Sequence, residues 1–311
     1  MTASDPLPIL TGLGIEDVVD CSPLPSGMGG TLLWKVTRDT APQQLVLRVF
    51  PGGHDHLAAR EAAAHRIAIA GGVPAPQVIA SGRPVLRGQR GDDVAIVMTW
   101  SPGRQAAEEL LASPDQAYAI GESCGRTLGA LHRIRPPGKA NAALGPDASW
   151  LTWSRGEHTE RVRELWSTTP FDRMRERPVL LHLDFHPENV LLDGREVSGV
   201  LDWANARWGP PEADLARSSA IMWLIPHHPR IPSEARPALA DYAAGLRAGH
   251  RTAYGPTSDA PLFTAWALSA QWADLERKVG TEGFWVSPAT LEELRDEAER
   301  AFARAESRSG A

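Results

Sequence analysis

The chain has 311 residues, a formal net charge of −6 and 42% hydrophobic residues. This is the composition of an ordinary globular protein, and it excludes a fibrous or largely disordered chain. The mild acidity argues against a nucleic-acid-binding protein, because such proteins usually carry a basic patch. The two cysteines, Cys21 and Cys124, are too few for a disulfide framework or a cysteine-rich metal site.

The sequence shows no targeting or membrane signal. No basic segment followed by a long apolar run opens the chain, and no stretch of 18 apolar residues occurs anywhere. We therefore expect a cytoplasmic protein with no membrane partner and no nucleic-acid partner.

The first hundred residues predict a small β-rich region. Leu32–Thr37 and Leu45–Phe50 are β-type runs separated by a polar turn, which is the pattern of a hairpin. The alanine-rich segment Ala58–Ala70 predicts a helix that ends at a Gly- and Pro-rich break. Gln77–Ser81 and Val94–Trp100 predict two further strands.

After residue 100 the pattern changes to helices. Ser113 before Pro114 predicts a helix start, and Tyr118–His132 has apolar residues at helical spacing. From Asp214 onward nearly every segment predicts a helix, ending in the amphipathic stretch Pro288–Arg308. We expect an α+β fold with two lobes, residues 1–100 and residues 101–311.

The segment that carries chemistry begins at His182. It reads His-Leu-Asp-Phe-His-Pro-Glu-Asn, and Asp202 follows Asn189 by 13 residues at the end of a short apolar strand. Phosphoryl transfer needs a carboxylate that accepts or orients the proton of the attacking hydroxyl, and Asp184 fits this role. It also needs hard oxygen ligands for Mg²⁺, and Asn189 and Asp202 fit that role.

This segment resembles the catalytic and metal-binding loops of the aminoglycoside phosphotransferase family, which has a choline-kinase-like and protein-kinase-like fold. The resemblance implies a small N-terminal nucleotide-binding lobe and a larger helical lobe with the catalytic loop, the metal site and the acceptor pocket. It also implies structural roles for two residues. His182 supports the loop through its imidazole, and the carboxylate of Asp214 ties the loop to the helix behind it.

Two further polar residues lie inside the loop. His186 is a candidate contact to phosphate or acceptor, and Glu188 is a candidate contact to the second metal ion or the acceptor. For Glu188 a solvated loop carboxylate is an equally good interpretation.

The N-terminal lobe is then expected to hold the nucleotide. Residues 25–31 (PSGMGGT) precede a strand, as a loop that covers phosphates would, and their glycines allow close backbone approach to phosphate oxygens. The segment is neither a full G-x-G-x-x-G motif nor a Walker A motif. The candidates in this loop are Ser26, Gly27, Gly29 and Gly30.

The phosphate-binding cation departs from the family pattern. Of the 32 basic residues only three are lysines, and Arg48 stands on the strand where the lysine is expected. Arg48 can bind phosphate oxygens through its planar fork, and Glu61, 13 residues later, is the expected ion-pair partner. Lys35 lies on the preceding strand, in a slot expected to face solvent. The connector after the sheet offers Met98 and Trp100 as nucleotide contacts through backbone groups.

The absent motifs argue against a protein kinase. No arginine separates His182 from Asp184, Asp202 is followed by Trp-Ala instead of Phe-Gly, and no A-P-E segment follows. Only a dozen residues separate Asp202 from Asp214, too few for an activation segment. A small-molecule kinase is favoured.

The acceptor lobe gives two conflicting indications. Residues 104–311 carry 29 Asp+Glu and 24 Lys+Arg, which suits a cationic acceptor. The same lobe is rich in tryptophan, which favours a bulky, partly apolar acceptor such as a macrolide or a nucleoside-type antibiotic if these rings line a pocket. The acceptor candidates are Trp208, Trp266 and Trp272, although packing in the core is the alternative for each.

The sequence therefore predicts a phosphotransferase that uses ATP or GTP with Mg²⁺ and transfers the γ-phosphate to a hydroxyl of a small molecule. An antibiotic of the aminoglycoside, macrolide or nucleoside type is the favoured acceptor. A metabolic kinase for choline, homoserine or a sugar is the alternative. A nucleotide-binding pseudokinase is a third hypothesis, supported only by Arg48.

Overall fold

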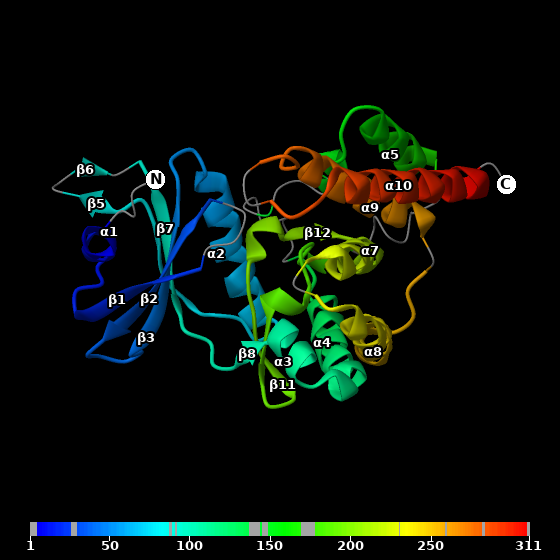
Figure 1. The fold of residues 1–311 in the computed structure, drawn as a ribbon. Coiled ribbons are helices and arrows are strands. Elements are labelled where there is room, and N and C mark those ends of the chain that lie inside the picture. The colour runs from blue at the N-terminus through cyan, green and yellow to red at the C-terminus, as the bar shows by residue number, and fades with distance from the viewer. Residues whose placement is uncertain are drawn as a thin grey trace.

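The computed structural model describes residues 5–25, 30–86, 89–90, 92–136, 144, 149–168, 178–229, 231–258, 260–281 and 284–309. Two parts lie side by side in Figure 1, a sheet flanked by the helix α2 and a larger group of helices. The sequence also favours a helix over Phe171–Arg177, and this segment lies outside the described residues.

The first part is built on an antiparallel five-stranded sheet in the order β1-β2-β3-β7-β4. Its elements are α1 (Pro6–Gly12), β1 (Val18–Leu24), β2 (Leu32–Arg38), β3 (Gln44–Phe50), α2 (Asp55–Ala70), β4 (Val78–Gly82), β5 (Val85–Leu86), β6 (Gln89–Arg90) and β7 (Val94–Thr99).

The second part is mainly helical, with three short β pairings at the edge that faces the sheet. Its helices are α3 (Ala106–Ala112), α4 (Ala117–Leu131), α5 (Glu157–Thr168), α7 (Pro211–Leu224), α8 (Arg236–Tyr254), α9 (Pro261–Glu276) and α10 (Pro288–Ser309). Its strands are β8 (Arg104–Gln105), β9 (Val179–Leu181), β10 (Val190–Asp193), β11 (Glu196–Val200) and β12 (Arg207–Gly209).

The α+β class predicted from the sequence is confirmed, and most boundaries agree within three residues. The central strand β3 shows why: Leu45, Leu47 and Val49 are at most 2% exposed while the residues between them are less buried. This period of two is what a sheet with one face on a core requires. The predicted helix start at Ser113 is wrong in detail, because a 3₁₀ turn (Pro114–Gln116) precedes α4 and Ser113 makes no side-chain cap.

The connector between the two parts passes through Gly103. Its φ is +104°, and a Cβ there would lie 2.2 Å from the carbonyl oxygen of Leu192 on β10. Only glycine fits both conditions. The connector is therefore held directly against the hairpin β10–β11, which follows the catalytic loop.

Helices α4 and α8 pack backbone to backbone. A Cβ on Gly125 would lie 2.1 Å from the carbonyl oxygen of Leu246, and one on Gly249 would lie 2.0 Å from that of Glu122. Such close approach holds His132, just after α4, beside His250 of α8.

No helix among the described residues is long and apolar enough to cross a membrane.

Candidate active site

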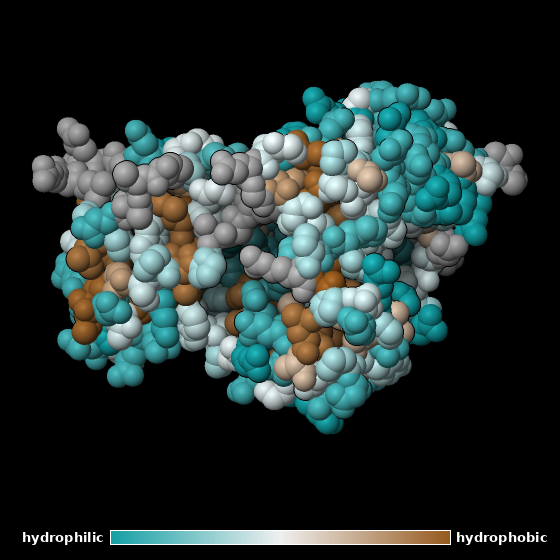
Figure 2. All heavy atoms as spheres, in the orientation of Figure 1, coloured by the Kyte–Doolittle hydropathy of each residue, from teal (hydrophilic) through white to brown (hydrophobic). Residues whose placement is uncertain are grey.

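The catalytic-loop segment leaves β9, whose three residues are all buried, and ends where β10 begins at Val190. Leu183 and Asp202 have φ values of +61° and +60°. Non-glycine residues rarely adopt this left-handed conformation, and it is found where surrounding contacts hold a functional segment in place. Figure 2 shows the surface hollowed between the sheet part and the helical part.

Asp214 supplies the contacts that hold Leu183 in this conformation. Its fully buried carboxylate accepts hydrogen bonds from the backbone N–H of His182 at 2.7 Å and of Leu183 at 2.8 Å. Burial opposes the charge of this carboxylate, but His132 and the loop N–H groups outweigh it, so the pKa of Asp214 is lowered. A charged acceptor of two backbone amides fixes the loop on α7.

A chain of two buried histidines extends from Asp214 to α8. Nε2 of His132 lies 3.1 Å from the Asp214 carboxylate. Nδ1 of the same ring lies 2.8 Å from Nε2 of His250. Burial lowers the pKa of His250 to about 3, so this ring is neutral near pH 7. Sequence reasoning did not identify this chain, since nothing in the local patterns pairs residues so far apart.

His182 supports the loop from inside. Its ring is fully buried, its Nε2–H donates to the carbonyl of Leu201 at 2.9 Å, and Nδ1 accepts from the N–H of Asp184 at 3.3 Å. Burial lowers the pKa of His182, which keeps the ring neutral. Its two contacts join the segment that carries Asp184 to the residue before Asp202.

Asp184, His186 and Asn189 lie together. Asn189 Nδ2 donates to the carbonyl of Asp184 at 2.9 Å and lies 3.0 Å from His186 Nε2, which is 4.0 Å from the Asp184 carboxylate. The Asn189 amide oxygen is thus turned away from these contacts. Glu188 has a 70% exposed side chain, and its carboxylate lies 3.9 Å from His186 Nδ1.

The cation of the sheet part reaches this loop. Arg48 donates to Glu61 at 2.9 Å and to Asp202 at 3.0 Å, so the predicted Arg48–Glu61 ion pair is present. The Glu61 side chain is 1% exposed and the Asp202 side chain is 38% exposed. Burial opposes the charge on both Arg48 and Asp202, but mutual attraction outweighs it, raising the pKa of Arg48 and lowering that of Asp202.

The residues present fit a magnesium ion that also binds substrate phosphates. One oxygen of Asp202 pairs with Arg48, which leaves the second oxygen, and the Asn189 amide offers another hard donor. Among the described residues no group of three or more His, Cys, Asp or Glu side chains could hold a metal by itself. Mg²⁺ usually binds one or two protein ligands together with phosphates and water, so this sparse set is appropriate.

The structure describes only part of the predicted nucleotide site. Ser26, Gly27 and Gly29 lie outside the described residues, while Gly30 has a φ of +68°. The Met98 side chain is 6% exposed and packs in the core of the sheet part, and the Trp100 N–H donates to the carbonyl of Gln44. The ammonium of Lys35 lies 4.6 Å from the centre of the Trp100 ring, so Lys35 packs on the connector instead of facing solvent alone.

Arg217 is a residue that sequence reasoning missed. It is 7% exposed on α7, donates to Gln271 on α9 at 2.5 Å, and lies close enough to Asp184 and Asp274 for electrostatic attraction. Burial lowers the pKa of Arg217, and no described carboxylate forms an ion pair with it. The available signal was an arginine inside the otherwise apolar stretch 216–225.

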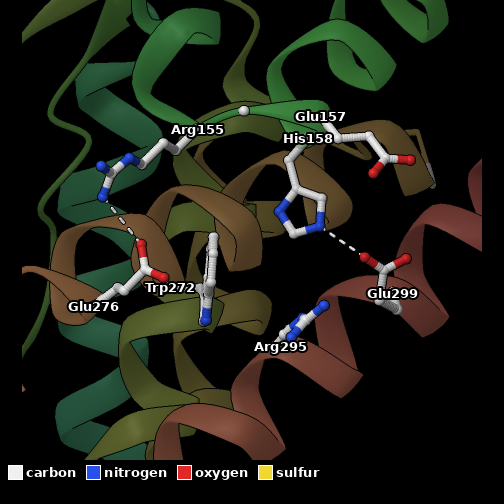
Figure 3. A pocket seen from close by; sticks show the side chains of 8 residues that line it. Arg155, Glu157, His158, Trp272, Glu276, Arg295 and Glu299 are labelled. Carbon is white, nitrogen blue, oxygen red and sulfur yellow. Dashed lines mark hydrogen bonds and ion pairs between the residues drawn. The ribbon is translucent and has the colours of Figure 1, made fainter.

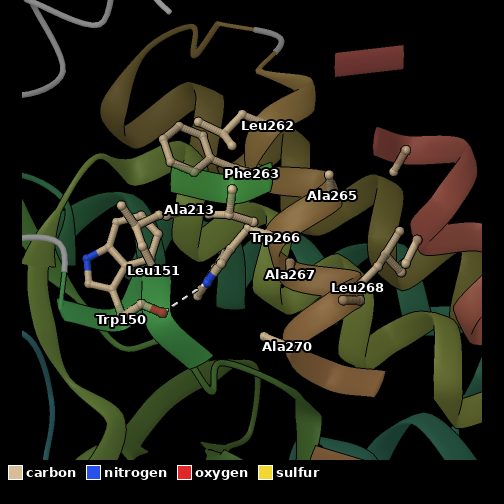
Figure 4. Packing of buried hydrophobic residues seen from close by; sticks show 14 of the residues in the cluster. Trp150, Leu151, Ala213, Leu262, Phe263, Ala265, Trp266, Ala267, Leu268 and Ala270 are labelled. Atoms are coloured by element: carbon tan, nitrogen blue, oxygen red, sulfur yellow. Dashed lines mark hydrogen bonds between the residues drawn. The ribbon is translucent and has the colours of Figure 1, made fainter. Parts of the chain in front are cut away.

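For two of the three tryptophans, the prediction that they contact the acceptor is wrong. Trp208 is 1% exposed and Trp266 is 0% exposed, and both pack within hydrophobic clusters. Figure 4 shows Trp266 enclosed beside Trp150, whose carbonyl accepts its Nε1–H at 3.0 Å. A ring with no exposed surface cannot contact a ligand, so these side chains belong to the core.

Trp272 is partly exposed, but its side chain points away from the catalytic loop. It lines a pocket of about 490 Å³ with residues of α9, α10 and the start of α5, including His158 and Arg295 (Figure 3). Residues project about 100° apart around a helix, so Trp272 points roughly 160° to 200° away from Asp274, which faces Arg217. The structure therefore does not bring Trp272 to Asp184.

The site thus combines a carboxylate in a restrained loop, two oxygen donors beside it and an ion-paired cation from the sheet, which are parts that phosphoryl transfer needs. The model of the phosphotransferase enzyme family matches residues 20–262. The chain therefore belongs to this family of phosphotransferases, as the motif predicted.

The chain is similar to viomycin phosphotransferase of Streptomyces vinaceus, with 29% identity over 169 residues. The match covers 48% of this chain and 56% of the relative, so the chain spans about half the length of this relative.

Solved structures share the fold. A spectinomycin phosphotransferase in complex with ADP and spectinomycin superposes with a TM-score of 0.58 at 12% identity, covering 96% of each chain. An aminoglycoside phosphotransferase of the APH(4)-Ia type, in a ternary complex with AMP-PNP and hygromycin B, gives 0.56 at 17% identity and covers 99% of each chain. The bilobal protein-kinase-like fold expected from the sequence is thereby confirmed.

Proposed function

We propose that the protein transfers the γ-phosphate of ATP or GTP to a hydroxyl group of an antibiotic-type small molecule. The observation that carries the proposal is the junction of Arg48 with Glu61 and Asp202, which joins the sheet part to the loop that holds Asp184. Residues 1–100 would bind the nucleotide, and residues 101–311 would supply the catalytic loop and the acceptor pocket.

On the nucleotide side, Arg48 is the residue that would contact phosphate oxygens. Glu61 holds the guanidinium in place, and the charge of Arg48 is permanent. Asn189 and Asp202 would hold Mg²⁺, which neutralises charge on the β- and γ-phosphates when bound. The glycines at 27, 29 and 30 and the backbone near Met98 and Trp100 would complete the proposed nucleotide site.

At the reacting centre, the acceptor hydroxyl would lie against the Asp184 carboxylate. Its oxygen forms a bond to the γ-phosphorus while the bond from that phosphorus to the β–γ bridging oxygen breaks, and Asp184 takes up the proton. A loose transition state demands little base strength, so orientation of the hydroxyl is the main contribution of Asp184. The anchoring of the loop by Asp214 and His182 supplies that orientation.

On the acceptor side, Arg217 and Asp274 are proposed contacts in place of the buried tryptophans. Arg217 presents a buried cation whose Nε has no partner among the described residues, and such a group binds an electron-rich oxygen of a ligand strongly. His186 and the exposed Glu188 remain proposed contacts at the loop.

The names of the relatives support an antibiotic acceptor, since they specify viomycin, hygromycin B and spectinomycin phosphotransferases or complexes. Such antibiotics are polar molecules, which the neighbouring side chains of Asp184, Arg217 and Asp274 could bind by hydrogen bonds. The test is release of nucleoside diphosphate, with ATP or GTP and Mg²⁺, over a panel of antibiotics, choline, homoserine and sugars.

We expect turnover with an antibiotic, and Asp184→Ala should lower kcat by at least about a thousandfold while nucleotide affinity stays within about threefold. Retained turnover in Asp184→Ala would reject the catalytic assignment. Turnover only with choline, homoserine or a sugar would favour the metabolic kinase, and nucleotide binding without turnover on any acceptor would favour the pseudokinase.

A further inference from the structure

A groove runs between α7 and α8 on the side of the helical part away from the catalytic loop. Its volume is about 580 Å³, and the loop 255–258 and the first turns of α9 contribute to its walls. This volume falls within the range of about 300–1,000 Å³ that small-molecule sites occupy.

The groove is separate from the proposed acceptor site because α7 lies between them. Arg217, which faces Asp184, and the groove residues of α7 project in opposite directions. At about 100° per residue, Leu215, Ser219 and Met222 are roughly 140° to 200° from Arg217 around the helix. A ligand in the groove would therefore contact a different face of α7 from an acceptor beside Asp184.

The groove has an apolar floor, and two of its lining residues, Ser218 and Glu212, each carry a buried polar atom without a hydrogen-bond partner among the described residues. Leu215, Met222, Leu239 and Leu246 supply aliphatic side chains from the two helices. Ser218 also lines the groove and is 1% exposed, and its hydroxyl has no hydrogen-bond partner among the described residues. A buried hydroxyl without a partner is costly, so a ligand that bonds to it gains free energy.

The charged groups of the groove are mostly cationic. Its lining contains Arg236, Arg247 and Arg251, all exposed, and a single carboxylate, Glu212. One oxygen of Glu212 accepts two hydrogen bonds from Ser258, and the other is buried without a partner among the described residues. Within the described part of the chain none of the three arginines forms an ion pair. On a protein with net charge −6, three unpaired arginines around an apolar floor are complementary to an anion with an apolar body.

We propose that the α7–α8 groove is a second ligand site, distinct from the phosphotransferase site, that binds a small amphipathic anion. The apolar body would lie on the floor formed by the leucines and Met222. The carboxylate or sulfonate head would bind the arginines, and Ser218 would donate its hydroxyl to a ligand oxygen.

The test is calorimetric titration of the full chain with decanoate and with decyltrimethylammonium, which share a C10 chain and differ in charge. We expect one decanoate per chain, bound at least about tenfold more tightly than the cation. Equal affinity for both probes, or no saturable decanoate binding, would overturn the proposal.

Two sets of variants locate the binding. Ser219→Trp and Ala243→Trp each place a large side chain in the groove, one from each helix, and each should abolish decanoate binding. The triple variant R236Q/R247Q/R251Q should bind decanoate at least about tenfold more weakly. The matched control R126Q/R300Q/R304Q has the same change in net charge elsewhere on the protein and should bind decanoate as wild type does. Thermal unfolding midpoints establish that the variants are folded.

Decanoate binding that survives both tryptophan variants would place the site elsewhere and reject the proposal. Concentration-dependent self-association that either tryptophan variant abolishes, seen by sedimentation without decanoate binding, would assign the groove to a second copy of the chain and also reject it.

Discussion

Arg48 and Arg217 lie on opposite sides of the catalytic loop with little exposed side-chain surface, and their surroundings differ. Arg48, on the nucleotide side, is held by two carboxylates, Glu61 and Asp202. Arg217, on the acceptor side, has only the neutral amide of Gln271 as a hydrogen-bond partner within the part of the chain that the structure describes. The charge of Arg48 is compensated by carboxylates before any ligand binds, whereas the charge of Arg217 has no ion-pair partner among the described residues. The Nε of each arginine is buried without a hydrogen-bond partner there.

Because of this difference, removing the charge should change the stability of the fold differently for the two arginines. Breaking a buried pair by removing one partner leaves an uncompensated charge and destabilises the fold. Removing a buried charge that lacks an ionic partner relieves a desolvation cost instead. The two arginines should therefore have opposite effects on stability, although both contribute to turnover.

The largest expected effect follows from Arg48→Ala. Glu61, with a 1% exposed side chain, would lose its cation, so the free energy of unfolding should fall by about 3–5 kcal/mol. The variant should also lose at least about a hundredfold in kcat/KM for the nucleotide. Urea unfolding and steady-state kinetics measure both effects. Arg48→Lys, which keeps the charge, should recover part of each; an unchanged unfolding free energy in Arg48→Ala would break the comparison.

The opposite outcome is expected for Arg217→Met. Methionine fills a similar volume without a charge, so the free energy of unfolding should stay the same or increase. The kcat/KM for the acceptor should fall by about 10- to 100-fold while the KM for the nucleotide stays constant. A loss of stability comparable to that of Arg48→Ala would show that Arg217 is a structural residue.

Acid stability sharpens the contrast. Arg48 lowers the pKa of Asp202 below its ordinary value of 3.8, so the unfolded chain binds that proton first as the pH falls. The contribution of the pair is therefore complete above about pH 4 and is lost as the pH falls through the lower folded pKa. Between about pH 6 and about pH 3.5, the free energy of unfolding measured in urea should decrease less for Arg48→Met than for wild type. Arg217→Met should show a decrease closer to that of wild type, because the pKa of Asp274 is lowered mainly by Lys278 and Arg277 and only slightly by Arg217.

The smallest effect is expected for Gln271→Leu. This change removes the hydrogen bond that orients Arg217 but keeps the cation beside Asp184. The acceptor KM should rise by about three- to tenfold with kcat nearly constant, because a charged hydrogen bond of this kind contributes about 1 kcal/mol or more. An acceptor KM equal to that of wild type would mean that Gln271 does not position Arg217.

The local motif was sufficient for the class of protein and for much of the loop. His182, Asp184 and Asn189 lie within eight residues, so their mutual placement depends on a single turn and the start of one hairpin. The strands and their buried faces follow from the period-two pattern of apolar residues, as in β3. The pairing of Arg48 with Glu61 follows from the family resemblance, in which a cation on this strand pairs with a glutamate of the next helix, and the ion pair is present.

Contacts between distant segments could be settled only by the tertiary structure. A tryptophan on an apolar helix suits a pocket as well as a core, and only the packing of α9 on Trp150 buries Trp266. The approach of Arg217 to Asp184 and the His132–His250 chain join residues 33 and 118 positions apart, respectively. The sequence by itself therefore determined the chemistry of the loop, because its spacing is local, while the tertiary structure decided which side chains share that site, because burial depends on elements packed from elsewhere in the chain.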